Sequence, residues 1–235
     1  MRKLGIIQPG RLGDIIICLP IAKFYFDRGY EIIWPILNSY YSIFRDVTYV
    51  NFINLNCDIL DSVYKSLEVF SEYDCEIIDL SFGFPGSSAS KYHYNTDFAP
   101  NFVEAKYKLA NVPLSERWNL KYNRNHKKEL ELYNKIIKNK QYILVHEDSS
   151  QGNHLCFNGN EFIKLKQIED YTIFNWMKII ENASAIYCVD SSLCNLIESQ
   201  RYLSHKPKKY FTVKPHSSGW GRTTLTNNWE IINSL

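Results

Sequence analysis

The sequence lacks a strong charge of either sign. Its 27 lysine and arginine residues nearly balance its 25 aspartate and glutamate residues, which leaves a formal net charge of +2 at pH 7. Dedicated nucleic-acid-binding domains are usually far more basic, with lysine and arginine gathered on one surface. The composition therefore argues against nucleic acid as a partner.

Long apolar runs and cysteine pairs are also absent. No run approaches the ~20 apolar residues of a membrane-spanning helix, so no membrane span is expected. No internal repeat or low-complexity segment stands out. The absence of a CxxC pair argues against a zinc ribbon, and a disulfide scaffold is unusual in a chain of 235 residues. We expect a cytoplasmic protein with buried, reduced thiols at Cys18, Cys57, Cys75, Cys156, Cys188 and Cys194.

The sequence does contain a regular alternation of strand-like and helix-like segments. Hydrophobic residues make up 45% and charged residues 22% of the chain, as in an ordinary globular protein. Short apolar runs alternate with segments of helical periodicity, a rhythm typical of parallel sheets with crossover helices. In the first half, the pattern predicts strands at 3–8, 31–36, 48–55 and 75–82, helices at 14–28, 58–72, 102–111 and 126–139, and a long loop at 83–101.

A second, shorter series follows residue 140. The pattern there predicts strands at 141–148, 162–168, 185–190 and 209–215, helices at 172–182 and from Ser191, and a short closing helix at 229–235. The predicted fold class is therefore α/β, with two Rossmann-like parallel-sheet domains that face each other across a cleft. Their expected bounds are 1–140 and 141–235.

Residues 6–20 carry the first candidate motif, IIQPGRLGDIIICLP. A strand enters a turn with Gly10 and Gly13, and a helix opens directly after it, a geometry that directs free N–H groups at an anion. The motif is neither a P-loop nor GxGxxG, because it lacks the lysine of the first and a glycine of the second. Asp14 allows two interpretations: a helix N-cap, or a functional carboxylate at a strand's carboxyl end, where α/β sheets bind ligands.

Two further motifs lie at strand ends in the second half. In AIYCVDSSLCNLIES (185–199), Asp190, Ser191 and Ser192 precede a helix, where they form either a helix cap or a seat for a diphosphate. In LVHEDSSQGNH (144–154), a strand again ends in a polar cluster. Two histidines eight residues apart in this segment are weak evidence for a metal, so no metal site is expected. A cleft between two domains with polar strand ends suits a two-substrate reaction.

These motifs resemble those of the GT-B glycosyltransferases, and most of all the bacterial ADP-heptose:lipopolysaccharide heptosyltransferases (glycosyltransferase family 9). That family opens with a strand, a Gly-Asp turn, apolar residues and a proline, as in GRLGDIIICLP at 10–20. It also has a late strand followed by Asp-Ser/Thr-Gly and a helix, similar to CVDSSLCNL at 188–196. The resemblance covers the two ends of the chain and the general layout.

The resemblance implies an inverting, metal-independent transfer of a sugar from a nucleoside-diphosphate sugar to a glycan or other hydroxyl acceptor, without a further cofactor. Asp14 falls where the family has its proposed catalytic base, and Gly10, Arg11 and Gly13 form the loop beside it. The first domain is then the acceptor domain and the second the donor domain. The implied donor-diphosphate ligands are Asp190, Ser191, Ser192, Ser149, Ser150, Asn195 and His154, and Glu198 is a candidate for the donor ribose or a surface carboxylate.

The sequence also departs from the family pattern. Ser192 replaces the usual glycine, Asn195 stands where a histidine is common, and His154 lies near a position often held by lysine. These departures favour an alternative, a catalytically silent nucleotide-sugar or glycan-binding module. An RNA-binding role based on the GxxG at 10–13 is disfavoured, because a strand rather than a helix precedes it. Basic candidates to stabilise the leaving group are Arg11, His154, Lys214 and Arg222.

Overall fold

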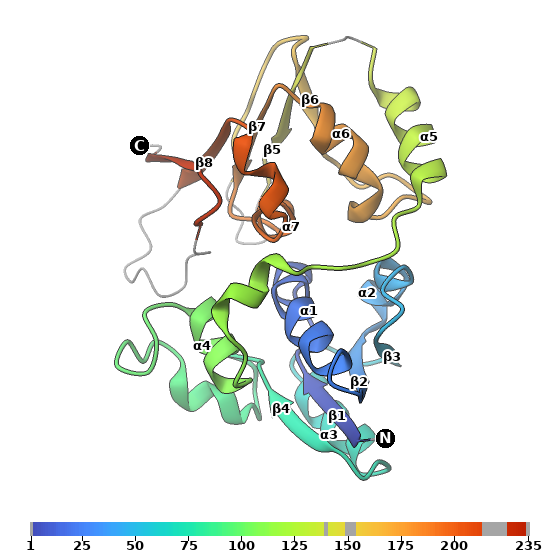
Figure 1. Cartoon of the computed structure of the whole chain (residues 1–235), viewed down its shortest axis with the longest axis vertical. Helices are drawn as coiled ribbons and strands as arrows, with labels where there is room; N and C mark the ends of the chain where they lie inside the picture. The colour runs from blue at the N-terminus through green and yellow to red at the C-terminus, as the bar shows by residue number, and fades with distance from the viewer. Residues whose placement is uncertain (1, 139–140, 149–153, 213–224, 234–235) are drawn as a thin grey trace. The chain divides into compact units, whose positions relative to one another are not determined.

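The computed structural model describes residues 2–138, 141–148, 154–212 and 225–233. The chain forms two compact units, and the division between them falls between Asn123 and Arg124. Each unit holds one sheet whose strands all run parallel (Figure 1). The predicted α/β class with two parallel sheets is therefore confirmed.

The first sheet has the strand order β3-β2-β1-β4. β1 (Arg2–Ile7) pairs with β2 (Tyr30–Leu37) and β4 (Glu76–Asp79), and β3 (Asn51–Leu55) pairs with β2. Because β1 lies inside the sheet, the residues that follow it reach the middle of the sheet's carboxyl edge. The helices of this unit are α1 (Leu12–Phe26), α2 (Asn38–Tyr41), α3 (Ser62–Phe70) and α4 (Phe102–Leu109), with 3-10 turns η1 (Ser42–Phe44), η2 (Ser88–Tyr92) and η3 (Leu114–Trp118).

The helix α1 is apolar and buried over most of its length. All eight residues from Ile15 to Ala22 are buried, as expected for a helix whose apolar residues are not confined to one face. It packs on β2, α4 and η3. Shortly after it ends, Gly29 adopts a φ of 84°, a left-handed conformation that glycine tolerates without strain. The apolar sequence thus fixes α1 as the buried support for the segment at its amino end.

The second sheet has the strand order β6-β5-β7-β8-β9. Its strands are β5 (Ile143–His146), β6 (Phe162–Lys164), β7 (Ala185–Val189), β8 (Lys208–Thr212) and β9 (Glu230–Asn233). β5 and β7 lie inside the sheet, so the segments that follow them reach its carboxyl edge. The helices are α5 (His126–Ile136), α6 (Met177–Asn182) and α7 (Ser192–Glu198), with 3-10 turns η4 (Ile173–Trp176) and η5 (Arg201–His205).

The division between the units falls earlier than the expected boundary at residue 140. The reason is α5, which packs against α6 and η4 of the second unit. Leu132 of α5 is fully buried. The sequence pattern placed this helix in the first half only because the strand rhythm restarts after it.

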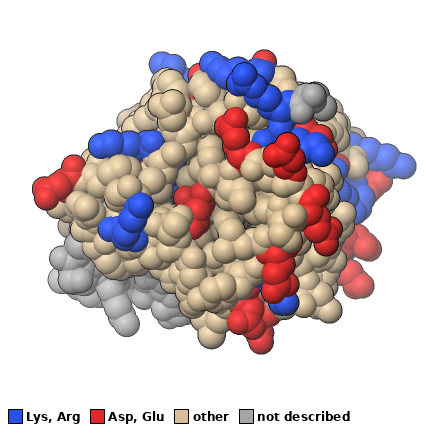
Figure 2. Space-filling model, turned by 90° about the horizontal axis from the view of Figure 1, so that it is seen from below, with Lys and Arg blue, Asp and Glu red and all other residues tan. Residues whose placement is uncertain are grey.

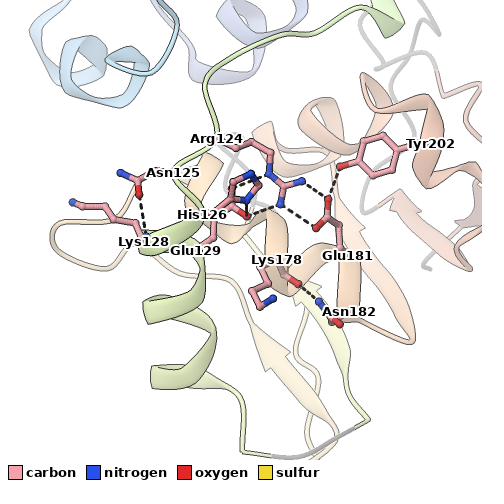
Figure 3. Close-up of polar contacts among 9 residues, drawn as sticks. All are labelled: Arg124, Asn125, His126, Lys128, Glu129, Lys178, Glu181, Asn182 and Tyr202. Atoms are coloured by element: carbon pink, nitrogen blue, oxygen red, sulfur yellow. Dashed lines mark hydrogen bonds and ion pairs between the residues drawn. The ribbon is translucent and has the colours of Figure 1, made fainter.

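The second unit begins with an ion-pair cluster around Arg124 (Figure 3). The guanidinium of Arg124 donates to both carboxylate oxygens of Glu129 and to both of Glu181. Tyr202 donates a further hydrogen bond of 2.8 Å to Glu181. Hydrogen bonds to Glu129 and Glu181 raise the pKa of Arg124. This cluster joins the start of the unit to α5, α6 and η5.

The closing segment is a strand, so the predicted helix at 229–235 is wrong. Glu230–Asn233 pair in parallel with β8. An isolated helix of seven residues has little stability in water, whereas β8 offers a row of backbone hydrogen-bonding groups. Ile231 and Ile232 are β-branched and suit an extended strand.

Charge is spread over the molecular surface. Figure 2 shows both acidic and basic side chains on one face, separated by broad uncharged areas. Among the described residues, no helix is long and apolar enough to cross a membrane.

All six cysteines are free thiols. Cys18, Cys188 and Cys194 are buried, as expected, but Cys156 is exposed. Burial raises the pKa of the Cys18 thiol to about 12 and also raises that of Cys194. These two thiols are therefore protonated and unreactive at neutral pH.

Candidate functional site

Asp14 lies in the first turn of α1, at the carboxyl edge of the first sheet. It is the third residue of the helix and not its N-cap: Arg11 occupies that position, with no side-chain capping bond. The N-cap interpretation of Asp14 therefore does not hold. A carboxylate in the first turn interacts favourably with the positive end of the helix, and the side chain remains 20% exposed.

The turn before Asp14 is tightly constrained. Gly10 is buried, and a Cβ there would lie 3.2 Å from side-chain carbons of both Ile59 and Leu37. Arg11 has a φ of 61°, an uncommon left-handed conformation for a residue other than glycine, asparagine or aspartate. Its exposed guanidinium lies 5.4 Å from the ring centroid of Phe84. Close packing thus explains Gly10, and Arg11 offers a cation near the same edge.

A buried lysine on α4 contacts Asp14. The Nζ atom of Lys106 lies 3.4 Å from Oδ1 of Asp14, and the Lys106 side chain is only 1% exposed. The ammonium also donates to Oε1 of Gln8 and to the carbonyl oxygen of Leu80. Gln8 follows β1 and Leu80 follows β4, so Lys106 connects two strand ends to the start of α1. The ammonium thus donates two hydrogen bonds and lies at ion-pair distance from one carboxylate.

Lys106 is a site residue that the sequence reasoning missed. A signal was present: Val103, Lys106 and Ala110 recur at helical spacing, and both neighbours on this stripe are fully buried. A lysine on the apolar stripe of a helix must find acceptors inside the protein, because burying an unpaired ammonium costs several kcal/mol. Its presence there is the sequence feature that points to a buried carboxylate partner.

His93 lies near the two cations of this edge. Burial lowers its pKa, and the positive charges of Arg11 and Lys106 lower it further. Its ring stacks on Tyr94 with a centroid distance of 4.1 Å. Gly83, at a φ of 75°, leaves room for the imidazole, because a Cβ there would lie 3.0 Å from Cε1 of His93. His93 is therefore a neutral imidazole at pH 7.

The loop after β4 is held by a single carboxylate. Asp79 accepts hydrogen bonds from the backbone N–H groups of Ser81, Ser88 and Ala89. The hydroxyls of Ser81, Ser87 and Ser88 donate to it as well. The glycine- and serine-rich composition of the segment 83–101 predicted a loop; the structure shows that Asp79 gives it a fixed path and that η2 forms within it.

In the second unit, the segment after β7 has the predicted strand-to-helix geometry. Ser191 is the N-cap of α7, and its Oγ accepts a long hydrogen bond of 3.5 Å from the backbone N–H of Cys194. Asp190, Ser191 and Ser192 are half-buried. Asn195 is 6% exposed, and its Oδ1 is buried without a hydrogen-bond partner among the described residues. Ser191 thus caps α7, as one interpretation of the sequence predicted. The same helix carries Oδ1 of Asn195, an acceptor without a partner among the described residues.

The strand end of β5 provides another unsatisfied polar atom. The Nδ1 atom of His146 is buried and, within the described parts of the chain, has no hydrogen-bond partner. Burial lowers the pKa of this histidine. His154 is exposed and its Nδ1 lies 2.6 Å from Oδ1 of Asp148. The expected diphosphate ligands Ser149 and Ser150, and the basic candidates Lys214 and Arg222, lie outside the described residues.

Glu198 has a role different from ribose binding or a surface carboxylate. It is 0% exposed. Its carboxylate accepts hydrogen bonds from the backbone and hydroxyl of Thr226, the backbone of Asn227 and the indole of Trp229. These contacts tie the segment before β9 to α7. Both carboxylate oxygens are occupied in this way, so Glu198 acts as a structural anchor.

Metal ligation is not a feature of the described residues. Within the part of the chain that the structure describes, no group of three or more His, Cys, Asp or Glu side chains is placed to hold a metal ion. Charge at the carboxyl edge of the first sheet is carried instead by Arg11, Asp14 and Lys106.

Each of the two α/β units has a sheet of parallel strands, with polar side chains at the carboxyl edge of that sheet. This arrangement defines a GT-B-like fold. No protein-family model matches the chain, and no curated protein matches it in sequence. Solved structures do match in fold. ADP-heptose lipopolysaccharide heptosyltransferase II of E. coli aligns with a TM-score of 0.60 and 14% identity, covering 100% of this chain and 91% of that one.

Two further glycosyltransferases show the same similarity. A glycosyl transferase of family 9 from Veillonella parvula aligns with a TM-score of 0.59 at 10% identity. The alignment covers 98% of this chain and 86% of the Veillonella chain. E. coli heptosyltransferase WaaC, solved with ADP, aligns with a TM-score of 0.52 at 11% identity, over 98% and 92% of the two chains. The predicted resemblance is confirmed at the level of the fold.

Proposed function

We propose that the protein is a glycosyltransferase that moves a sugar from a nucleoside-diphosphate sugar to an acceptor hydroxyl, with inversion and without a metal. The observation that carries the proposal is Asp14: a carboxylate at the carboxyl edge of the first sheet, paired through one oxygen with a buried lysine and partly open to solvent. In a GT-B-like fold this group is suited to act as a general base.

The proposed reaction is a single displacement. Asp14 accepts the proton of the acceptor hydroxyl as that oxygen attacks the anomeric carbon of the donor. The bond between the anomeric carbon and the diphosphate oxygen breaks, and the nucleoside diphosphate leaves with the electron pair. Attack from the side opposite the leaving group inverts the anomeric configuration. The first unit is then the acceptor domain, with Gly10, Arg11 and Gly13 beside the base.

The second unit is the proposed donor domain. Ser191, Ser192 and the amino end of α7 supply hydroxyl and N–H donors for diphosphate oxygens. Asn195 and His146 each present a buried polar atom that lacks a partner in the described residues, and buried polar atoms without partners are uncommon in folded proteins. A donor nucleotide or its sugar supplies hydrogen-bonding groups for such atoms. Asp190, His154, Ser149 and Ser150 remain predicted contacts of the diphosphate.

A second candidate function is a nucleotide-sugar or glycan-binding module without turnover. The observation in its favour is His154, the basic candidate for leaving-group stabilisation in the described part of the second unit, which is already paired with Asp148. A diphosphate that leaves without a cationic partner is a poor leaving group. A glycosyltransferase and a nucleotide-sugar-binding module both require donor binding, and only the first requires turnover.

Donor binding is tested by the thermal unfolding midpoint in the presence of ADP-, GDP-, UDP- and CMP-sugars. ADP-sugars come first, because one of the structures of similar fold was solved with ADP. A ligand at 100 times its Kd stabilises the folded state by about 2.7 kcal/mol, enough for a clear shift of the midpoint. An Asn195→Leu variant is expected to weaken the shift. If none of these nucleotide sugars changes the midpoint, the glycosyltransferase and the nucleotide-sugar-binding module are both excluded.

A further inference from the structure

We propose that Lys106 is a positioning residue for Asp14: its buried ammonium holds the carboxylate by an ion pair in the place where it can accept the proton. This inference rests on the proposed function, because it assigns Asp14 the part of the base. Lys106 does not touch the reacting atoms in this account. It acts through the orientation and charge of Asp14.

The geometry supports a fixed carboxylate. Lys106 is held at three points by Gln8, Leu80 and Asp14. Gln8 is itself fully buried and fixed, since its amide donates to the carbonyl oxygen of Gly10 at 2.8 Å. The indole of Trp34 donates to the backbone oxygen of Gln8 at 3.0 Å. Lys106 therefore cannot move without breaking a buried network, and Asp14 is held by an immobile cation.

The ion pair leaves the carboxylate of Asp14 accessible. Its shortest contact with Lys106 is made by Oδ1, at 3.4 Å. Among the described residues, the structure records no hydrogen bond to the side chain of Asp14, which is 20% exposed. A carboxylate that is held by an ion pair and still open to solvent can take a proton from a ligand hydroxyl.

Among the described residues, the charge of Lys106 faces one carboxylate and, at 5.4 Å from its centroid, the ring of Phe82. Asp14 is the one carboxylate recorded within ion-pair distance of this ammonium among them. An apolar side chain at this position of α4 would pack without the cost of burying a charge. The ammonium therefore provides a counter-charge for Asp14 in particular.

The competing explanation is that Lys106 only braces α4 against the strand ends. The two explanations differ in their kinetic consequences. A brace affects stability, and the correctly folded fraction of a variant then turns over at the normal rate. A positioning residue affects kcat in the folded protein, while KM for the donor, which binds in the second unit, stays nearly constant.

The experiment compares three variants of the full chain in release of nucleoside diphosphate, with the donor that gives the largest thermal shift and a panel of sugar acceptors. Lys106→Met removes the charge at nearly constant length. Lys106→Gln removes the charge but can still donate to Gln8 and Leu80, which guards against a folding defect. Lys108→Met is the matched control, because Lys108 lies on the same helix, is exposed, and contacts the carbonyl oxygen and the ring of Phe98.

We expect both Lys106 variants to lower kcat by about 10- to 100-fold, the scale of a misplaced catalytic group, with KM for the donor changed by less than about threefold. Lys108→Met should match the unmodified protein. If the folded Lys106 variants retain the normal kcat, the positioning role is wrong and the proposed function stands. If the unmodified protein binds donors but releases no nucleoside diphosphate, the proposed function fails and the inference falls with it.

Discussion

Lys106 and Asp14 form an ion pair in which the lysine is buried and the aspartate reaches the surface. Their charged atoms lie 3.4 Å apart, and the side chains are 1% and 20% exposed. The lysine comes from a helix that contributes nothing to the recognisable motifs, whereas the aspartate belongs to the most distinctive one. The pair therefore connects the predicted site to a part of the chain that the motifs did not reach.

The ion pair predicts energetic coupling between the two residues. Asp14→Asn leaves the ammonium of Lys106 buried without a counter-charge, at an expected cost of about 2–3 kcal/mol in the free energy of unfolding. The double variant Asp14→Asn/Lys106→Met removes both charges and should be less destabilised than the sum of the single variants, by about 1–3 kcal/mol. Urea unfolding of the four proteins measures this coupling. Strictly additive effects would show that the two charges do not interact.

Arg124 should be a major stabilising residue of the second unit. Arg124→Met leaves the carboxylate of Glu129, which is 1% exposed, without its guanidinium partner. We expect a loss of about 2 kcal/mol or more in the free energy of unfolding. Lys209→Met is the control, since it breaks an exposed pair with Glu230 and should cost less than about 1 kcal/mol. Equal effects of the two substitutions, measured by urea unfolding, would contradict the cluster's importance.

Glu198 should be needed for stability and not for donor recognition. Glu198→Ala removes the acceptor of donors on Thr226, on the buried Asn227 and on the half-buried Trp229, so the free energy of unfolding should fall by about 3 kcal/mol. The donor-dependent rise of the thermal midpoint should persist in this variant. Glu230→Gln, an exposed change on β9, serves as the control. A variant that is fully stable but no longer responds to donor would restore the ribose-binding role.

Acid should weaken the protein through His146. Burial lowers its pKa in the folded state below the ordinary 6.5, so the unfolded chain binds the proton more readily. The contribution of the neutral imidazole to stability is then complete above about pH 6.5 and is lost as the pH falls through the lowered pKa. His146→Gln should reduce the loss of stability between about pH 7.5 and pH 5. His93, whose pKa is also lowered, contributes in the same direction, so an unchanged slope in the His146 variant alone is the contradicting result.

The central strands and helices follow from the sequence because their signals are local. Short apolar runs predicted β1, β2 and β7, and the long apolar pattern predicted α1. The closing segment at 229–235 was predicted wrongly because its conformation depends on distant partners. Pairing with β8 and the anchor at Glu198 impose an extended backbone on it.

The site divides in the same way. Asp14 could be predicted because it lies next to the turn that defines the motif. Lys106 could not be paired with it from the sequence, since 92 residues separate the two positions and only the packing of α4 against α1 brings them together. Glu198 shows the opposite case. The sequence places this carboxylate shortly after the candidate diphosphate seat, but in the structure it binds the segment before β9.

The most direct test of the account is release of nucleoside diphosphate from the best-binding nucleotide sugar, compared between the unmodified protein and Asp14→Asn. Both proteins should show the donor-dependent rise of the thermal midpoint, because the proposed donor site lies in the other unit. The unmodified protein should turn over, and Asp14→Asn should be slower by roughly 100-fold or more, the contribution of a general base. Equal rates of release in the two folded proteins would contradict the assignment of Asp14 as the base.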